Sequence, residues 1–178
     1  MAEYDNTNRG QIWKNDRKEK DTHPEYKGYG NFNGKDFWKT ITKKELAKIL
    51  VKHKKWRDEF GEGERADFSY VDLSGADLRM ANLRYANFSG ANLCGADLSN
   101  SNLRYGNLSN IDFSNANLSD ADLSEAWFNN ANLSGADLSD ADMRGAIFSN
   151  ANLSYADLSG AIFSNANLSG AILSNANF

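Results

Sequence analysis

The sequence predicts an all-β solenoid over residues 66–178, and two observations carry this prediction. A large apolar residue recurs at every fifth position from Phe68 to Phe178, 23 times without loss of register. Alanine stands two positions before 19 of these 23 apolar centres, and the exceptions are Val71, Ser101, Gly106 and Ile111. A period of five fits neither a lone α-helix, which repeats every 3.6 residues, nor a flat strand, which repeats every two. A fixed short period over such a length is typical of a repeat architecture.

The positions around each apolar centre have distinct roles. The residue before the centre is Asp or Asn in 19 of 23 repeats, and the residue after it is Ser in 16 of 22. The next residue is Gly, Asn or Asp in 16 of 22 repeats, and these types tolerate left-handed backbone conformations. Each repeat is therefore expected to form about three extended residues and then a corner. Corners that turn the same way close a loop, and successive loops stack at about 4.8 Å.

These repeats resemble the signature of the pentapeptide-repeat family, as in Ala-Asp-Leu-Ser-Gly at 156–160 and Ala-Asn-Leu at 91–93. The resemblance implies a right-handed quadrilateral β-helix with four repeats per coil. Residues 66–178 would then make a little under six coils, a rod roughly 28 Å long. Positions 20 residues apart would share one of four columns, whose first apolar centres are residues 68, 73, 78 and 83. The first column would stack phenylalanines as core filling, at Phe68, Phe88, Phe128 and Phe148.

Residues 41–65 are predicted to form a helix that caps the first coil. Thr42 and Glu45 have the spacing of a capping box. Apolar residues then follow at helical spacing, which predicts a helix over about 43–59 that Gly61 ends. A solenoid needs a cover over the exposed end of its core. The lysines of this helix would face water or an anionic partner, at positions 43, 44, 48, 52, 54 and 55.

Residues 1–40 are predicted to form a small β appendage, with a hairpin signal at Asn33-Gly34. Asn8–Asn15, His23-Pro24 and the stretch around Asn33 resemble a small β-module of phage proteins, from which we assign no activity. Aromatic residues alternate with lysines in this segment. They would form either the module's minimal core or a stacking surface for single-stranded nucleic acid. Direct nucleic-acid binding is expected only through residues 1–40.

Composition places the chain among small intracellular proteins. Residues 1–65 carry 16 Lys/Arg and 12 Asp/Glu, whereas residues 66–178 carry four arginines and 12 acidic residues. Cys94 is the only cysteine, so an internal disulfide is excluded and a reducing compartment is expected. No apolar run approaches the roughly 18 residues of a membrane span, and the N-terminus does not resemble a signal peptide. We expect a cytoplasmic, soluble protein.

The residues that carry enzyme chemistry are sparse. The only histidines are His23 and His53, and neither is near Cys94 or an acidic cluster in the sequence. There is no pair of Cys or His at metal-ligand spacing and no glycine-rich phosphate loop. The many serines occupy corner positions without a neighbouring base. We therefore expect a protein that is not an enzyme and has no catalytic residues, metal or cofactor.

The column map gathers carboxylates on one side of the rod. We call this set the acidic face: Asp77, Asp97, Asp120, Asp122, Asp137, Asp140, Asp142 and Asp157. Each Asp would bond to its own corner backbone, as Asn does at equivalent sites. The resemblance adds a second interpretation, because some pentapeptide-repeat proteins are acidic rods that occupy the DNA-binding saddle of a topoisomerase. The charge limits this idea: duplex DNA carries roughly 16 charges over such a length, and the repeat region nets −8.

Two further surfaces stand out. Apolar residues replace Asp or Asn at outward positions in the C-terminal half, and together with the last residue they form the apolar set Trp127, Ile147, Ile162, Ile172 and Phe178. We expect this end to form a homodimer. The second surface is an Arg/Tyr patch, which would contact residues 1–40 or bind a partner: Arg84, Tyr85, Arg104 and Tyr105.

The function expected from these features is a protein-interaction module, with mimicry of DNA as its sharper form. A nucleic-acid-binding N-terminal module on a dimerising scaffold is the alternative, and a structural spacer is a third. The identity of the partner does not follow from the sequence.

Overall fold

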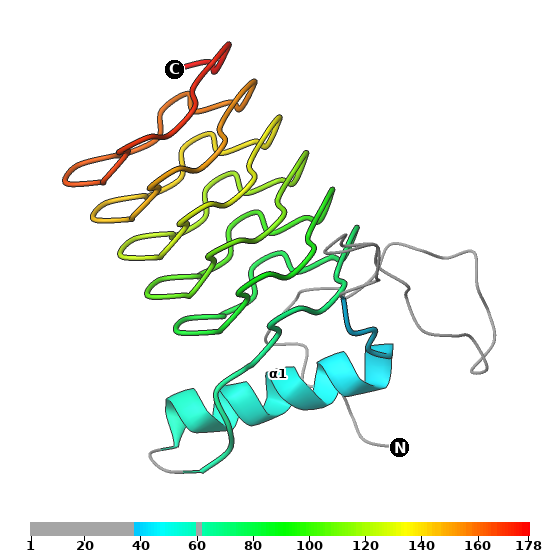
Figure 1. Cartoon of the computed structure of the whole chain (residues 1–178). Coiled ribbons are helices and arrows are strands. Elements are labelled where there is room, and N and C mark those ends of the chain that lie inside the picture. The colour runs from blue at the N-terminus through cyan, green and yellow to red at the C-terminus, as the bar shows by residue number, and fades with distance from the viewer. Residues whose placement is uncertain (1–37, 60–61) are drawn as a thin grey trace.

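The computed structural model describes residues 38–59 and 62–178 (Figure 1). Residues 66–178 form a rod of stacked coils, in which parallel β-bridges join residues 20 positions apart, from Asp67↔Asn87 to Asp157↔Asn177. Four repeats therefore close one coil, so residues 66–165 make five coils and 166–178 most of a sixth. The predicted closed solenoid of a little under six coils is confirmed.

Each side of a coil is one short extended segment with a single bridge, followed by a tight corner. The N–H of Val71 donates to the carbonyl of Phe68, and the same bond recurs at every later corner to Ala176 except that of Ile111. Every fifth residue from 70 to 175 has a positive φ, between 55° and 71°. Gly, Asn or Asp occupies 16 of these 22 positions as expected. The other six carry larger residues, for which the left-handed conformation costs roughly 1–2 kcal/mol each: Tyr70, Met80, Tyr85, Tyr105, Glu125 and Tyr155.

The bore of the rod is filled by the apolar centres and closed by the small residues beside them. From Phe68 to Leu158 every apolar centre is at most 2% exposed. The ring centroids of Phe68 and Phe88 lie 4.9 Å apart, and those of Phe128 and Phe148 lie 4.5 Å apart. The phenylalanines of the first column are therefore core filling, as predicted.

Helix α1 spans Lys43–Asp58 and begins where the capping box predicts. The Thr42 hydroxyl accepts a hydrogen bond from the Glu45 amide, and the Glu45 carboxylate accepts one from the Thr42 amide. The helix ends one residue before the predicted end, with Glu59 as C-cap. Leu46 is fully buried in the same cluster as the core of the rod, and α1 lies across the N-terminal end of the coils (Figure 1).

Residues 38–40 belong with the first coil, which differs from the predicted appendage boundary at residue 40. Lys39 forms a parallel bridge with Val71, in the place that a preceding coil would occupy. The indole N–H of Trp38 donates to the Gly90 carbonyl at 2.9 Å. The remainder of the predicted appendage, together with Phe60 and Gly61, lies outside the described residues. In the described part of the chain, no helix is long and apolar enough to cross a membrane.

Candidate interaction surfaces

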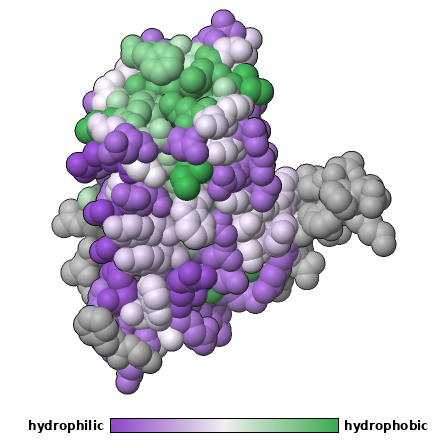
Figure 2. Space-filling view, turned by 60° about the vertical axis from the view of Figure 1, so that its left-hand side comes forward, coloured by the Kyte–Doolittle hydropathy of each residue, from purple (hydrophilic) through white to green (hydrophobic). Residues whose placement is uncertain are grey.

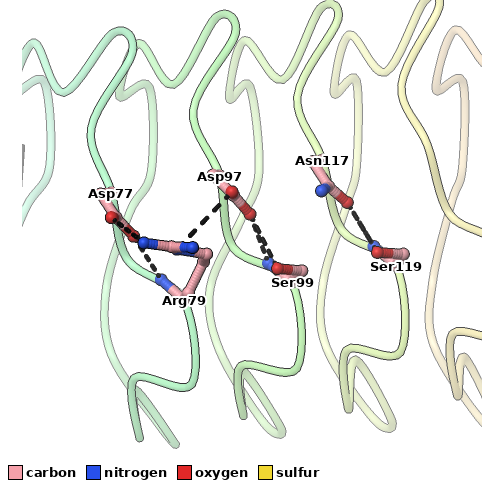
Figure 3. Close-up of polar contacts among 6 residues, drawn as sticks. All are labelled: Asp77, Arg79, Asp97, Ser99, Asn117 and Ser119. Carbon is pink, nitrogen blue, oxygen red and sulfur yellow. Dashed lines mark hydrogen bonds and ion pairs between the residues drawn. The ribbon is translucent and has the colours of Figure 1, made fainter. Parts of the chain in front are cut away.

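The Asp and Asn side chains before each centre bond to their own corners. The Ser119 amide donates to Asn117 Oδ1 at 3.0 Å, and the Ser139 amide donates to Asp137 Oδ1 at 3.0 Å. Figure 3 shows this contact in two successive coils of the third column, at Ser99 and Ser119. Only a side-chain oxygen is needed, so Asp and Asn fit equally well. The local interpretation of the aspartates is therefore supported.

Asparagine also connects one coil to the next. Asn92 Nδ2 donates to Asp72 Oδ1 at 2.9 Å, and Asn177 Nδ2 donates to Asp157 Oδ1 at 3.0 Å. Where Asn and Asp alternate along a column, a donor lies between carboxylates. Where two aspartates follow each other along a column, no such donor lies between them. Their negative charges are then one coil spacing apart.

The acidic face contains two such successions in the C-terminal half of the rod. Asp137 is bridged to Asp157, and Asp122 to Asp142. Asp120 and Asp140 are exposed at positive-φ corners between these columns. Five carboxylates have no Lys or Arg of the described chain within 4 Å, and we call them the uncompensated carboxylates: Asp120, Asp122, Asp137, Asp140 and Asp157. The amide and hydroxyl of Ser159 hold the pKa of the Asp157 carboxyl below its usual value, so it is ionised at neutral pH.

Asp77 does not belong to the exposed acidic face, contrary to the prediction. Its residue is 1% exposed, and Arg79 bonds it through Nε at 2.8 Å and Nη2 at 2.6 Å. Arg79 Nε also lies 3.7 Å from Asp97 Oδ2 (Figure 3). Arg79 therefore neutralises the N-terminal end of the face.

Arg144 has the same effect on Asp142. Its Nε donates to Asp142 Oδ1 at 2.9 Å, and this bond lowers the pKa of the Asp142 carboxyl. The negative charge is thus concentrated on the uncompensated carboxylates.

Hydrophobic residues gather on the C-terminal coil (Figure 2). Ile162, Ile172 and Phe178 are 46%, 52% and 72% exposed. Trp127 is also more than half exposed, and the half-buried Ile147 is bridged to it one coil on. In earlier coils the amide of each apolar centre donates to the next coil. The amides of the last four apolar centres have no such partner in the described chain: Phe163, Leu168, Leu173 and Phe178.

The Arg/Tyr patch is an ordered ladder on two successive coils. The rings of Tyr85 and Tyr105 stack at 5.0 Å and 11°. The Arg84 guanidinium carbon lies 4.9 Å and 5.2 Å from these two ring centroids, and that of Arg104 lies 4.8 Å from the Tyr105 centroid. Each arginine donates through Nη2 to the hydroxyl of the tyrosine that follows it, at 3.2 Å and 3.0 Å.

Helix α1 supports this ladder, which sequence reasoning missed. The Trp56 ring meets Tyr85 edge to face at 6.0 Å, and His53 stacks on Trp56 at 5.7 Å. Arg57 Nη1 also donates to the Asn82 carbonyl at 3.0 Å. The only sign of this contact in the sequence was the helical spacing of His53 and Trp56. It could not show that Trp56 contacts Tyr85, which is about 30 residues away in the sequence. Any contact of the patch with residues 1–37 lies outside the described residues.

Metal ligands are not assembled in the described ranges, where no group of three or more His, Cys, Asp or Glu is placed to hold an ion. Cys94 is half-buried at a corner, where its amide donates to Asn92 Oδ1 at 3.0 Å. It takes the place that serine has after most apolar centres.

The stacked four-sided coils define the protein as a β-solenoid. The family model for pentapeptide repeats matches in eight copies, over residues 64–100, 96–135, 116–154, 128–165 and 161–178. The chain therefore belongs to the pentapeptide-repeat family, as its motifs predict, and this family's right-handed quadrilateral β-helix is its fold class. No curated protein sequence matches the chain.

Several solved structures are similar to parts of the chain. A pentapeptide repeat protein from the Arabidopsis thaliana thylakoid lumen is 33% identical over 50% of this chain and 62% of its own, with a TM-score of 0.49. Rfr23 from the cyanobacterium Cyanothece 51142 is 34% identical over 61% of this chain and 60% of its own, with a TM-score of 0.40. QnrB1, a plasmid-mediated fluoroquinolone resistance protein, is 24% identical over 62% of this chain and 78% of its own, with a TM-score of 0.27. The chain thus spans less than two thirds of the length of the first two.

Proposed function

We propose that the protein is a non-enzymatic interaction module whose acidic face binds the DNA-binding surface of a protein partner. The observation that carries this proposal is the group of uncompensated carboxylates on the third and fourth columns. Corner or inter-coil hydrogen bonds hold the side-chain oxygens of Asp122, Asp137 and Asp157, while Asp120 and Asp140 stand on fixed positive-φ corners between them. An array held in this way loses little conformational entropy when a partner binds.

The charge density of this array is comparable to that of one DNA strand. Residues 106–165 form three coils, about 14 Å of rod. One DNA strand carries about four phosphates over that length. The same coils present six carboxylates of the acidic face and Arg144, a net charge of −5 on that side. We therefore propose that the acidic face mimics a single DNA strand. The net charge of the whole rod is too small to match duplex DNA, but the charge on this side is comparable to that of one strand.

Replacement of the five uncompensated carboxylates by asparagine tests the proposal. Asparagine keeps the corner bond at positions 122, 137 and 157, as Asn117 does, and at positions 120 and 140 it suits the positive-φ corner, as Asn130 does, so the change removes only the charge. DNA gyrase and a second DNA-binding enzyme serve as probes, in binding and activity assays at low salt with duplex DNA as competitor. We expect the wild-type chain to bind and the fivefold variant to bind at least about tenfold more weakly, because charge complementarity is lost.

The matched control is the pair Asp67→Asn and Asp112→Asn, which removes charge from the first and second columns. This control should bind as tightly as the wild type. An absence of binding by the wild type at low salt, or equal weakening in the control, would remove the proposal.

We also propose that a second copy of this chain stacks on the last coil. Support comes from the exposed apolar residues of that coil and from its backbone amides that lack a partner. Stacking would pair those amides and cover Ile172 and Phe178, as each coil covers its neighbour elsewhere in the rod. Sedimentation at micromolar concentration should show a dimer for the wild type and a monomer for Ile172→Asp with Phe178→Asp. Val51→Asp, at an exposed site on α1, is the control. A wild-type monomer would contradict this proposal.

We also propose roles for the two segments that precede the rod. Residues 41–65 act as the N-terminal cap, supported by the burial of Ile41 and Leu46 in the same cluster as the first coil. A nucleic-acid-binding role of residues 1–40 remains a prediction, because residues 1–37 lie outside the described structure. A mobility-shift assay on the full chain checks that role.

A further inference from the structure

The two arginines of the Arg/Tyr patch differ from the other well-anchored arginines of the rod. Arg57, Arg79 and Arg144 each bond to a carboxylate. Arg84 and Arg104 bond only to a tyrosine hydroxyl and to the corner oxygen of an asparagine, and no carboxylate of the described chain is within ion-pairing distance. Neither arginine therefore forms an ion pair with a carboxylate of the described chain, although Arg104 is close enough to Asp142 to help lower the pKa of that carboxyl.

The ladder also places these charges next to each other. The two arginines are 20 residues apart, so the coil repeat sets their guanidinium groups roughly 5 Å apart. Two like charges at that separation repel by about 1 kcal/mol in water, and by more where water is partly excluded. The Nε atoms of both arginines are buried without a hydrogen-bond partner among the described residues. An anion bound beside the two guanidinium groups would offset this repulsion.

The backbone conformation at the two tyrosines of the ladder is unfavourable for tyrosine. Tyr85 and Tyr105 occupy corner positions with φ of 65° and 59°, where most repeats have Gly, Asn or Asp. Tyrosine is less favourable there than these residues. Its rings are nevertheless stacked and both are 36% exposed. The ring contacts and the hydroxyl hydrogen bonds of the two tyrosines restrict both arginines. We infer that the tyrosines hold the guanidinium groups in a fixed position.

We propose that Arg84 and Arg104 bind a side-chain carboxylate from a short acidic segment of a protein partner. Guanidinium groups bond carboxylates through paired N–H donors, and pre-ordered donors reduce the entropic cost of binding. This surface is separate from the uncompensated carboxylates, so the inference does not depend on the function proposed for them.

Nucleic acid fits the patch less well than an acidic peptide. Single-stranded nucleic acid needs a basic track and open aromatic faces for its bases. Tyr85 and Tyr105 stack on each other, and Trp56 also meets Tyr85 edge to face. Further along the same column the charge becomes negative, at Asp122 and Asp142. A site with two cations and an acidic border suits one or two carboxylates better than a phosphate backbone.

Titration of the full chain with a hexaglutamate peptide tests this site. The ¹⁵N–¹H signals of the arginine Nε groups are the readout, with inorganic phosphate and a ten-nucleotide oligothymidylate as separate arms. We expect the peptide to shift the Arg84 and Arg104 signals saturably and to leave those of Arg79 and Arg144 in place. Phosphate binding as tightly as the peptide would mean adventitious anion binding only, and tighter binding of the oligonucleotide would assign the site to nucleic acid. Either result overturns the proposal, as does an absence of shifts.

Variants separate the charge from its positioning. Arg84→Gln with Arg104→Gln should weaken peptide binding at least tenfold, whereas Arg144→Gln should leave it within twofold, because Arg144 is already paired with Asp142. Tyr85→Phe with Tyr105→Phe keeps the rings and removes the hydroxyls that hold the guanidinium groups. It should weaken binding severalfold with an unchanged circular dichroism spectrum. If the glutamine variant fails to fold, the phenylalanine variant and the resolved arginine signals still decide the outcome. Equal affinity in the phenylalanine variant and the wild type would contradict the positioning role.

Discussion

Phe128→Ala is expected to lower the free energy of unfolding by about 3–5 kcal/mol. Phe128 is fully buried in the middle of the rod, stacked on Phe148 at 4.5 Å and 9° and tilted against Phe113 at 6.4 Å. Alanine removes the ring and leaves a cavity that the surrounding coils cannot fill, because each side of a coil is anchored to both neighbours by backbone bonds. Urea unfolding followed by circular dichroism measures the change.

Phe178→Ala is the matched control, because Phe178 is an apolar centre of the same repeat pattern but is 72% exposed. It should change the stability by less than about 1 kcal/mol at a concentration at which the chain is monomeric, since little burial is lost. A loss below about 1 kcal/mol for Phe128→Ala as well would mean that the bore of the rod is not packed as described.

The second large effect concerns pH. His53 is 1% exposed, and its Nδ1 accepts a hydrogen bond from the Ala66 amide at 3.1 Å. Burial, and then the nearby positive charge of Arg57, lower the pKa of His53 from 6.5 to about 4 in the folded chain. The unfolded chain takes up this proton below about pH 6.5, whereas the folded chain takes it up only below about pH 4.

Between these two values the unfolded state binds more protons, so the stability rises with pH. The contribution of His53 is fully present above about pH 6.5 and is lost as the pH falls towards 4. The loss is on the order of 3 kcal/mol. Urea unfolding at pH 7, 6, 5 and 4 measures it.

The control for the pH effect is His53→Gln, which removes the titrating group and retains an oxygen that can accept from the Ala66 amide. Its stability should be nearly constant over most of the same range. The lowered pKa values of Glu45, Asp67, Asp142 and Asp157 also stabilise the chain at neutral pH, and this stability is lost as the pH falls to 4 and below, in the wild type and in His53→Gln alike. Identical slopes for the wild type and His53→Gln would show that His53 is not held neutral in the folded chain.

Both predictions connect the stability of the rod to the contacts of its first coil and its core. His53 also stacks on Trp56, which meets Tyr85 of the ladder. Protonation of His53 would therefore weaken the packing of α1 against the coil that carries the Arg/Tyr patch. The same region of the protein thus holds its strongest pH dependence and one of its candidate binding surfaces.

Local chemistry made much of the rod predictable. The five-residue period determines which side chains point inward, and the positive-φ corners favour Gly, Asn and Asp. Both the inward positions and the corners can therefore be recognised in the sequence of most repeats. The corner bond of Asp and Asn was also predictable, because it joins residues two positions apart. The burial of Asp77 was not, since its environment depends on which carboxylates Arg79 reaches across a coil boundary.

The sequence by itself determined a closed, stacked solenoid with its phenylalanine column, because a strict repeat imposes the same geometry on every coil. Only the tertiary structure decided which charges remain uncompensated and which aromatic residues meet. The sequence pointed to Asp137 and Arg84 as surface residues, but not to their ion pairing, and it gave no sign that Trp56 contacts Tyr85. Their roles follow from neighbours 20 or more residues away, brought close by the winding of the chain and by the docking of α1 on the first coil.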